Sequence, residues 1–479
     1  MNYSIIRYIL CRVLEFLGIF LILPCIVALI YGEKEGFAYL VVGAGCFLAG
    51  FAGKHFKPHS SVFYAREGFV TVSLSWIILS LIGAIPFVIT GEIPNYIDAV
   101  YEMTSGFTTT GASVITDLSL ISRCTNFWRL FSHWIGGMGV LVFILAILPL
   151  SGSYNMHLMR AESPGPVVGK LVPKVKNTAK ILYGIYIVIT IIEVIALLIT
   201  GLPVYESLTL TFSTVGTGGF ALVGDSLASY PIASQIVITV FMILCGVNFN
   251  VYYLLLIRKP KEILKSEEVR TYFIIIFVSS LLITWNIYGT FENIRMDFHN
   301  AILQVASIIT TTGFATVDYN YWPEFSKTIL VMLTLIGACA GSTGGGFKVS
   351  RLVVLFKSIR NEISQVIHPR SVKKVHLDSK IIPDGVTRSI RIYLMIYVVV
   401  FLGSVLIISL DNFDFTTNFT AVAANLNNVG PGLNDVGPAG NYAGFSMLSK
   451  IVLTFDMLIG RLEFLPMLVL MNYSTWKKC

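Results

Sequence analysis

Residues 107–112 read FTTTGA, and the same kind of run occurs three more times, as FSTVGT at residues 212–217, ITTTGF at 309–314 and LNNVGP at 426–431. Each run has a large apolar residue four positions before its glycine, and Thr, Ser or Asn two and three positions before it. The four glycines, Gly111, Gly216, Gly313 and Gly430, lie 105, 97 and 117 residues apart. Runs repeated at such a period indicate one structural unit used four times.

The composition is that of a membrane protein. Hydrophobic residues make up 55% of the 479 residues, charged residues make up 13%, and the mean hydropathy is +0.76, whereas soluble domains have about 25% charged residues. Apolar stretches of about twenty residues, the length that crosses a bilayer, recur from end to end. We therefore expect an all-α polytopic membrane protein with ten spans, near residues 8–31, 36–54, 69–91, 127–150, 179–201, 232–257, 271–289, 326–356, 388–410 and 446–472.

The glycine runs alternate with these spans. After the first two spans, each later pair of spans encloses a shorter, semi-polar segment that ends at one of the four glycines. Non-helical backbone at membrane depth is tolerated only where protein buries it or where it lines a water-filled path. Each unit contains an even number of crossings, so all four units point the same way. The pattern predicts an N-terminal two-helix hairpin (residues 1–60) and four parallel repeats of span, re-entrant segment and span around one central pore, at residues 61–157, 158–262, 263–372 and 373–479.

Basic residues set the predicted orientation. Lys and Arg gather in one set of connections, and Asp and Glu gather in the opposite set. By the positive-inside rule, the basic connections and both termini are cytoplasmic and the glycine runs open outward. The net charge of +7 is then a topology signal, so we expect membrane lipid around the chain and no nucleic-acid partner.

The chemistry suggested by the runs is cation dehydration. A permeating cation must exchange its water shell for other oxygens, and a ring of backbone carbonyls can supply them. Glycine permits the backbone dihedrals that such a ring needs, and neighbouring Thr, Ser or Asn side chains can hold the loop. The alternative for any single run is an ordinary turn. No nucleophile–base set, carboxylate pair or metal-ligand pattern stands out, so the chain is predicted not to be an enzyme and to need no covalent cofactor.

Further segments extend the pattern to a known family. The four runs, together with WIGGMG at residues 134–139, GACAGSTGGGFK at 337–348 and GRLE at 460–463, resemble the Trk/Ktr/HKT superfamily of potassium transporters. The N-terminal hairpin is typical of its bacterial TrkH branch. This resemblance implies potassium uptake across the bacterial plasma (inner) membrane through a gated, channel-like pore, with K⁺ as the transported ligand. The alternatives are a sodium- or proton-coupled potassium symporter, or a weakly selective potassium/sodium pathway of the same fold.

The resemblance also implies which residues form the site. One matching glycine per repeat, against Gly-Tyr-Gly in potassium channels, implies moderate selectivity, and Gly111 stands where sodium-permeable members have serine. The selectivity filter is expected to bind K⁺ through the backbones of Thr110, Gly111, Val215, Gly216, Thr312, Gly313, Val429 and Gly430.

The same resemblance implies a gate formed by Gly344, Gly345 and Gly346, in the segment 337–348 that interrupts the eighth span, and by Arg461. The glycines could instead mark a helix kink or a close helix contact. Arg461 could instead pair with Glu463 or extend toward the interface. A phosphate-binding loop is disfavoured, because the order Gly-Lys-Ser/Thr is missing.

Partners follow from the family alone. The resemblance implies a homodimer and a cytosolic, nucleotide-binding regulatory subunit of the TrkA kind. The basic connections 157–180, 258–270 and 357–391 are candidate docking surfaces, although their charges could serve only to set topology. Parallel repeats favour a channel-like pore over an alternating-access carrier, which usually has inverted repeats.

Overall fold

The computed structural model of the chain describes residues 1–55, 64–139, 175–291, 293–370, 373–378 and 380–477. Within this part the fold is almost entirely helical, as the sequence predicts. One antiparallel pair of short strands, β1 (His376–Leu377) and β2 (Lys380–Ile381), lies between two helices. The predicted span 127–150 and the basic connection 157–180 lie partly outside the described residues.

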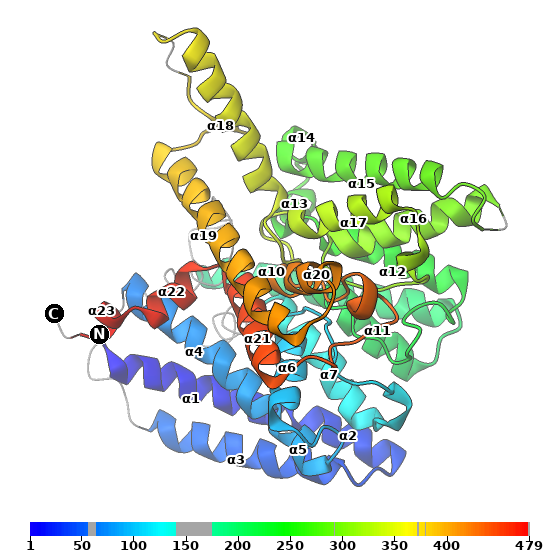
Figure 1. Ribbon diagram of the computed structural model, residues 1–479. Coiled ribbons are helices and arrows are strands. Elements are labelled where there is room, and N and C mark those ends of the chain that lie inside the picture. The colour runs from blue at the N-terminus through cyan, green and yellow to red at the C-terminus, as the bar shows by residue number, and fades with distance from the viewer. Residues whose placement is uncertain (56–63, 140–174, 292, 371–372, 379, 478–479) are drawn as a thin grey trace.

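The chain begins with the predicted hairpin, made of α1 (Tyr3–Phe20), α2 (Ile22–Tyr31) and α3 (Gly36–Lys54). These helices lie together along one side of the molecule (Figure 1). Glycines allow α1 and α3 to approach closely, since a Cβ on Gly18 would lie 2.6 Å from the Gly43 carbonyl oxygen and one on Gly50 would lie 2.5 Å from that of Cys11. Such small-residue contacts are typical of helices packed in membranes.

Four short, mostly buried helices precede the glycine runs within the described residues: α6 (Tyr96–Phe107), α11 (Val204–Gly216), α16 (Ile294–Ile309) and α20 (Phe415–Leu426). Side chains of Asn95, Asn293 and Asp414 cap α6, α16 and α20 by accepting backbone N–H groups of the first turn, and Pro203 precedes α11. These caps satisfy helix donors that would otherwise lack partners. Helices α6 and α20 lie near the middle of the molecule (Figure 1).

The remaining helices surround these four. They are α4 (Ala65–Gly83), α5 (Ile85–Thr90), α7 (Arg123–Gly137), α10 (Val175–Ile199), α12 (Ile232–Cys245), α13 (Phe249–Leu256), α14 (Pro260–Lys265), α15 (Glu267–Asn286), α17 (Glu324–Ile336), α18 (Val349–Ile367), α19 (Asp384–Ile408), α21 (Met447–Leu462), α22 (Leu465–Met471) and α23 (Tyr473–Trp476). Single turns of 3₁₀ helix are η1 (Leu118–Leu120), η2 (Tyr319–Tyr321), η3 (Ser409–Asp411) and η4 (Asn434–Val436). Helix α18 extends away from the body of the molecule (Figure 1).

Fewer helices than predicted are long enough to cross a bilayer. By length and hydropathy, six segments in the described residues qualify, and the pair α12 and α13, bent by 90°, would add a seventh. The four expected spans that do not qualify are the second spans of the repeats. Three of them contain α12, α17 and α21, which end before the predicted span does, and the fourth, 127–150, lies partly outside the described residues. The repeat boundaries at residues 60, 157, 262 and 372 stay predictions.

Candidate functional site

The four short helices end in the same backbone motif. After each helix one residue adopts the left-handed conformation, and the N–H of the following residue donates to the carbonyl five positions earlier, over 2.8 to 2.9 Å. This is the Schellman arrangement of helix C-termini. The left-handed residues are Thr109, Thr217, Thr311 and Asn428, with φ of 56°, 54°, 58° and 55°.

This conformation is strained at three of the four positions. Threonine is β-branched, and a positive φ is an outlier for such a residue, at a cost of order 1–3 kcal/mol each. Polar side chains hold the strained turns: the hydroxyls of Thr108 and Thr110 lie 2.8 Å apart, and Asn428 donates to Thr110 Oγ1 over 3.0 Å. Strain of this kind is typical of functional sites.

Two residues after each left-handed position stands a glycine, and these four glycines form a closed ring. Each has φ between 80° and 93°. A Cβ added to any one of them would lie within 2.5 Å of a carbonyl oxygen of the next strand, so both the dihedral and the space require glycine. The four contacts are Gly111 with Gly218 O, Gly219 with Thr312 O, Gly313 with Val429 O, and Gly430 with Thr110 O.

The second member of this ring differs from the predicted one. The structure places Val215 and Gly216 three residues too early, in the last turn of α11, and Gly219 occupies the ring position. Gly216 is instead a packing glycine, because a Cβ there would lie 2.5 Å from the His133 carbonyl oxygen. An apolar residue lies four positions before each of the two glycines, Phe212 before Gly216 and Val215 before Gly219. The sequence Gly-Phe-Ala, shared by residues 219–221 and 313–315, is the signal that distinguishes them.

One face of the ring opens into a small cavity of about 140 Å³, lined by all four ring glycines and by residues that follow them. Around it, side chains tie the strands to one another. Tyr442 donates its hydroxyl to the Gly430 carbonyl over 2.7 Å and its N–H to the Ser113 carbonyl over 2.9 Å. The fourth strand is thereby connected to the first.

The other face of the ring is covered by the glycine-rich segment 337–348. Helix α17 ends at Ile336 and α18 begins at Val349, so the predicted interruption of this span is confirmed. Gly345 donates its N–H to Thr311 Oγ1 over 2.6 Å, and a Cβ on Gly345 would lie 2.5 Å from the Asn427 carbonyl oxygen. The segment therefore packs directly against two of the four strand ends.

Arg461 lies beside this segment. Its Nη1 donates to the Thr343 carbonyl over 2.7 Å, and its Nη2 donates to the carbonyls of Gly136 and Gly137 over 2.5 and 2.9 Å. The guanidinium thus joins segment 337–348 to the end of α7. Glu463, the neighbour considered as its partner, forms an ion pair with Arg351.

Acidic and basic groups also hold the ends of the segment. Glu268, at the start of α15, accepts the N–H groups of Ala340 over 2.6 Å and Ser350 over 3.2 Å through one carboxylate oxygen. Lys348 donates to the Gly344 carbonyl. One buried carboxylate therefore fixes both ends of the segment at once.

Known proteins resemble this chain over most of its length. A family model described as TrkH, cation transport protein, matches residues 42–475. The chain belongs to the TrkH family. It is therefore grouped with transporters and not with enzymes.

Individual members of the TrkH family match over nearly their whole length. The Trk system potassium uptake protein TrkH of Salmonella typhimurium is 34% identical, over 96% of each chain. The Trk system potassium uptake protein TrkG of Escherichia coli is 32% identical, over 100% of each chain. The crystal structure of the potassium transporter TrkH from Vibrio parahaemolyticus superposes with a TM-score of 0.89 at 31% identity and covers 100% of both chains.

Proposed function

We propose that this chain carries potassium ions into a bacterial cell through a pore whose selectivity filter is the ring of four glycine-containing strands. The observation that supports this most directly is the closure of the ring, in which each glycine contacts the carbonyl oxygen of the next strand. The relatives with this fold are named as potassium uptake proteins or as a potassium transporter. The cell location proposed is the inner membrane, with both termini cytoplasmic.

Backbone carbonyls would replace the water around the ion. The filter proposed from the sequence keeps six of its residues, namely Thr110, Gly111, Thr312, Gly313, Val429 and Gly430, and takes Gly218 and Gly219 in place of Val215 and Gly216. All four short helices direct their C-terminal ends at the ring, and the negative end of a helix dipole favours a cation there. The Gly430 carbonyl already accepts a hydrogen bond from Tyr442. We therefore expect the ion to be bound by the carbonyls of the residues that precede the ring glycines, namely Thr110, Gly218, Thr312 and Val429.

The gate proposed is segment 337–348, with Gly344, Gly345 and Gly346, together with Arg461. Its contacts with Thr311 and Asn427 close the inner face of the ring. The positive charge of Arg461 adds an electrostatic barrier at the same level. Opening the pore then requires the segment to leave the ring.

No coupled reaction is needed to drive uptake. A membrane potential contributes about 2.3 kcal/mol per charge per 100 mV, enough for roughly fiftyfold accumulation of a monovalent cation. In vesicles, a channel-like pore reverses flux at the potassium equilibrium potential. A symporter instead reverses where the gradients of both coupled ions balance, which would contradict the channel-like mechanism.

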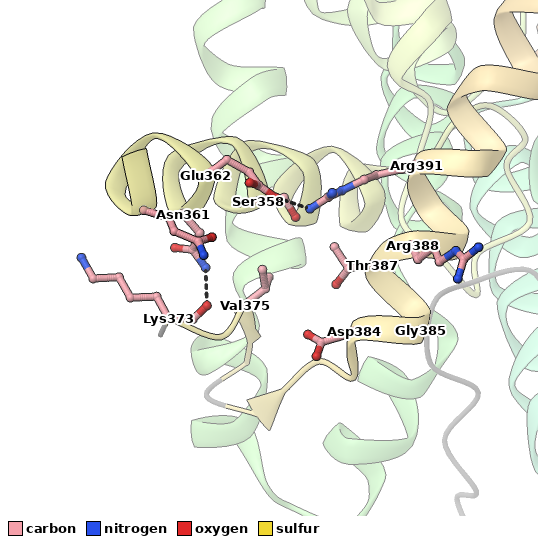
Figure 2. A pocket seen from close by; sticks show the side chains of 11 residues that line it. Ser358, Asn361, Glu362, Lys373, Val375, Asp384, Gly385, Thr387, Arg388 and Arg391 are labelled. Atoms are coloured by element: carbon pink, nitrogen blue, oxygen red, sulfur yellow. Dashed lines mark hydrogen bonds and ion pairs between the residues drawn. The ribbon is translucent and has the colours of Figure 1, made fainter. Parts of the chain in front are cut away.

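A regulatory subunit would act through α18. This helix begins where the gating segment ends, so force applied to α18 reaches the segment directly. Between α18 and α19 lies an open cleft of about 530 Å³, and Figure 2 shows Glu362 of α18 directed at Arg391 of α19, 2.9 Å away. We propose this cleft, within the basic connection 357–391, as the docking site of a cytosolic TrkA-like subunit on a homodimeric transporter. Loss of binding in Lys373→Glu would support this, and unchanged binding would contradict it.

The ring is tested by replacing its glycines one at a time. Gly111→Ala, Gly219→Ala, Gly313→Ala and Gly430→Ala should each reduce rubidium uptake and ion preference in liposomes, because the new Cβ displaces a neighbouring carbonyl. Gly201→Ala is the matched control, since Gly201 has φ of 93° but nothing within 4 Å of an added Cβ. The proposal fails if the ring variants behave like the control.

A further inference from the structure

A buried ion pair lies behind the first filter strand. Glu102 on α6 and Arg129 on α7 are 0% and 1% exposed. Nε and Nη2 of Arg129 donate to Glu102 Oε1 over 2.8 and 2.6 Å, and Nη1 donates to Asn126 Oδ1 over 2.8 Å. A charge removed from water is tolerated only when it is paired and hydrogen-bonded. Both conditions are met here.

The carboxylate of this pair holds the outer end of the first strand. Glu102 Oε2 accepts the N–H of Val114 over 2.9 Å, and the Ser113 hydroxyl lies 3.0 and 3.1 Å from the two carboxylate oxygens. Ser113 and Val114 directly follow Ala112, the residue after ring glycine Gly111. The position of this strand therefore depends on where Arg129 holds the carboxylate.

The guanidinium also reaches the second strand. Its carbon atom lies 4.3 Å from the centre of the Phe220 ring, and Phe220 directly follows ring glycine Gly219. The same ring stacks on His133 at 4.4 Å, and a cation over an aromatic face is attracted to it. One guanidinium thus contacts elements of two adjacent filter strands.

The other repeats have no charged pair at the matching positions. Glu102 lies seven residues before left-handed Thr109, and Arg129 lies seven residues before Gly136, which packs on the end of α6. In the other repeats we count back seven residues from the left-handed residues Thr217, Thr311 and Asn428, and from Gly246, Gly337 and Gly460, which follow α12 and α17 or lie near the end of α21 as Gly136 lies near the end of α7. All six positions reached in this way carry uncharged side chains. They are Leu210, Gln304 and Ala421 for Glu102, and Thr239, Leu330 and Leu453 for Arg129.

We propose that Glu102 and Arg129 are a positioning pair that fixes the spacing of the first two filter strands and thereby sets how sharply the ring distinguishes potassium from sodium. This inference rests on the proposed function of the ring. Carbonyl ligands favour one ion size only as far as their spacing or their number is maintained. Strands released from the pair can close around the smaller sodium ion, so the pair acts on selectivity without touching the ion.

Four variants release the strands in different ways. Ser113→Ala removes a hydroxyl that contacts Glu102, Phe220→Leu removes the aromatic face, and Glu102→Gln weakens the pair. The double variant Glu102→Met with Arg129→Met removes both charges together, because replacing a whole buried pair by apolar residues is tolerated far better than breaking it. Each is expected to lower the potassium-to-sodium permeability ratio about fivefold, which corresponds to about 1 kcal/mol.

The ratio is measured from reversal potentials in vesicles holding equal amounts of folded protein. A merely structural role would lower the yield or the total flux and leave the ratio unchanged, and that result in Ser113→Ala, Phe220→Leu and the double variant would overturn the inference. Thr239→Val, at the position matching Arg129 in the second repeat, is the control and should keep the wild-type ratio. If Gly313→Ala changes the ratio and these variants do not, only the pair is refuted. If Gly313→Ala also leaves it unchanged, the proposed filter fails.

Discussion

Replacing Arg461 is the sharpest test of the proposed gate. Arg461→Ala removes three hydrogen bonds, to the carbonyls of Thr343, Gly136 and Gly137, and hydrogen bonds to charged groups contribute about 1.5–3 kcal/mol each. It also removes a positive charge beneath the ring. If the ion path lies about 8 Å from that charge, a cation meets about 2 kcal/mol of repulsion at an effective dielectric constant near 20. We therefore expect basal flux to rise about thirtyfold.

The assay is rubidium uptake into liposomes by the chain alone, with the amount of folded protein matched. Arg461→Lys separates the two contributions, because it keeps the charge but lacks the planar fork that reaches several carbonyls. Its flux should lie between those of the wild type and Arg461→Ala. Arg12→Ala is the control, since Arg12 belongs to the N-terminal hairpin and pairs with Glu15. Flux of Arg461→Ala at or below the wild-type level would refute the reasoning.

Three further outcomes are expected. Thr311→Val removes the acceptor of the Gly345 N–H and should raise basal flux about fivefold, the equivalent of about 1 kcal/mol. Thr311→Ser keeps the hydroxyl and should match the wild type. Equal flux in both variants would contradict a role for this hydrogen bond in closing the gate. Glu268→Leu should also raise basal flux, because both ends of the gating segment lose their shared acceptor; unchanged rubidium leakage would exclude that role. Asp414→Ala should lower thermal stability at neutral pH by about 1 kcal/mol, as expected for a lost helix cap. Burial disfavours the Asp414 carboxylate, but hydrogen bonds from Thr417 and Asn434 outweigh this and keep its pKa below the ordinary value. Its stabilising effect is therefore present above the ordinary pKa of about 4 and is lost as pH falls through the lower folded-state pKa, so a stability difference that persists at lower pH would contradict the assignment.

Local chemistry in the sequence predicted much of this molecule. The amino-acid sequence alone reveals where a strained backbone position needs glycine. The runs at Gly111, Gly313 and Gly430 therefore identify ring positions. The clustered glycines of residues 337–348 likewise predicted a break in a helix, and the break has the predicted limits. These features depend on residues that are neighbours along the chain.

Features that depend on packing were not predicted. Gly216 satisfies the run pattern, whereas Gly219 has a glycine, Gly216, three positions before it. The pattern therefore selected Gly216, but the approach of His133 shows that Gly216 serves helix packing. Hydropathy measures composition, so it did not predict the 90° bend between α12 and α13 inside the expected span 232–257. Glu102 and Arg129 lie 27 positions apart on different helices, so no periodic pattern connects them.

The closure between Gly430 and Thr110 has a consequence for biosynthesis. The strand that completes the ring is made last, after more than 300 residues have followed its neighbour. Until Gly430 has been made, a nascent chain has only three of the four strands of the ring. Three strands cannot surround a dehydrated ion. The first and last described helices meet as well, since the Tyr3 hydroxyl of α1 donates to the Trp476 carbonyl of α23 over 3.3 Å. Figure 1 shows α23 beside the start of α1. A chain that ends before Gly430 therefore lacks the contact with Thr110 that completes the ring.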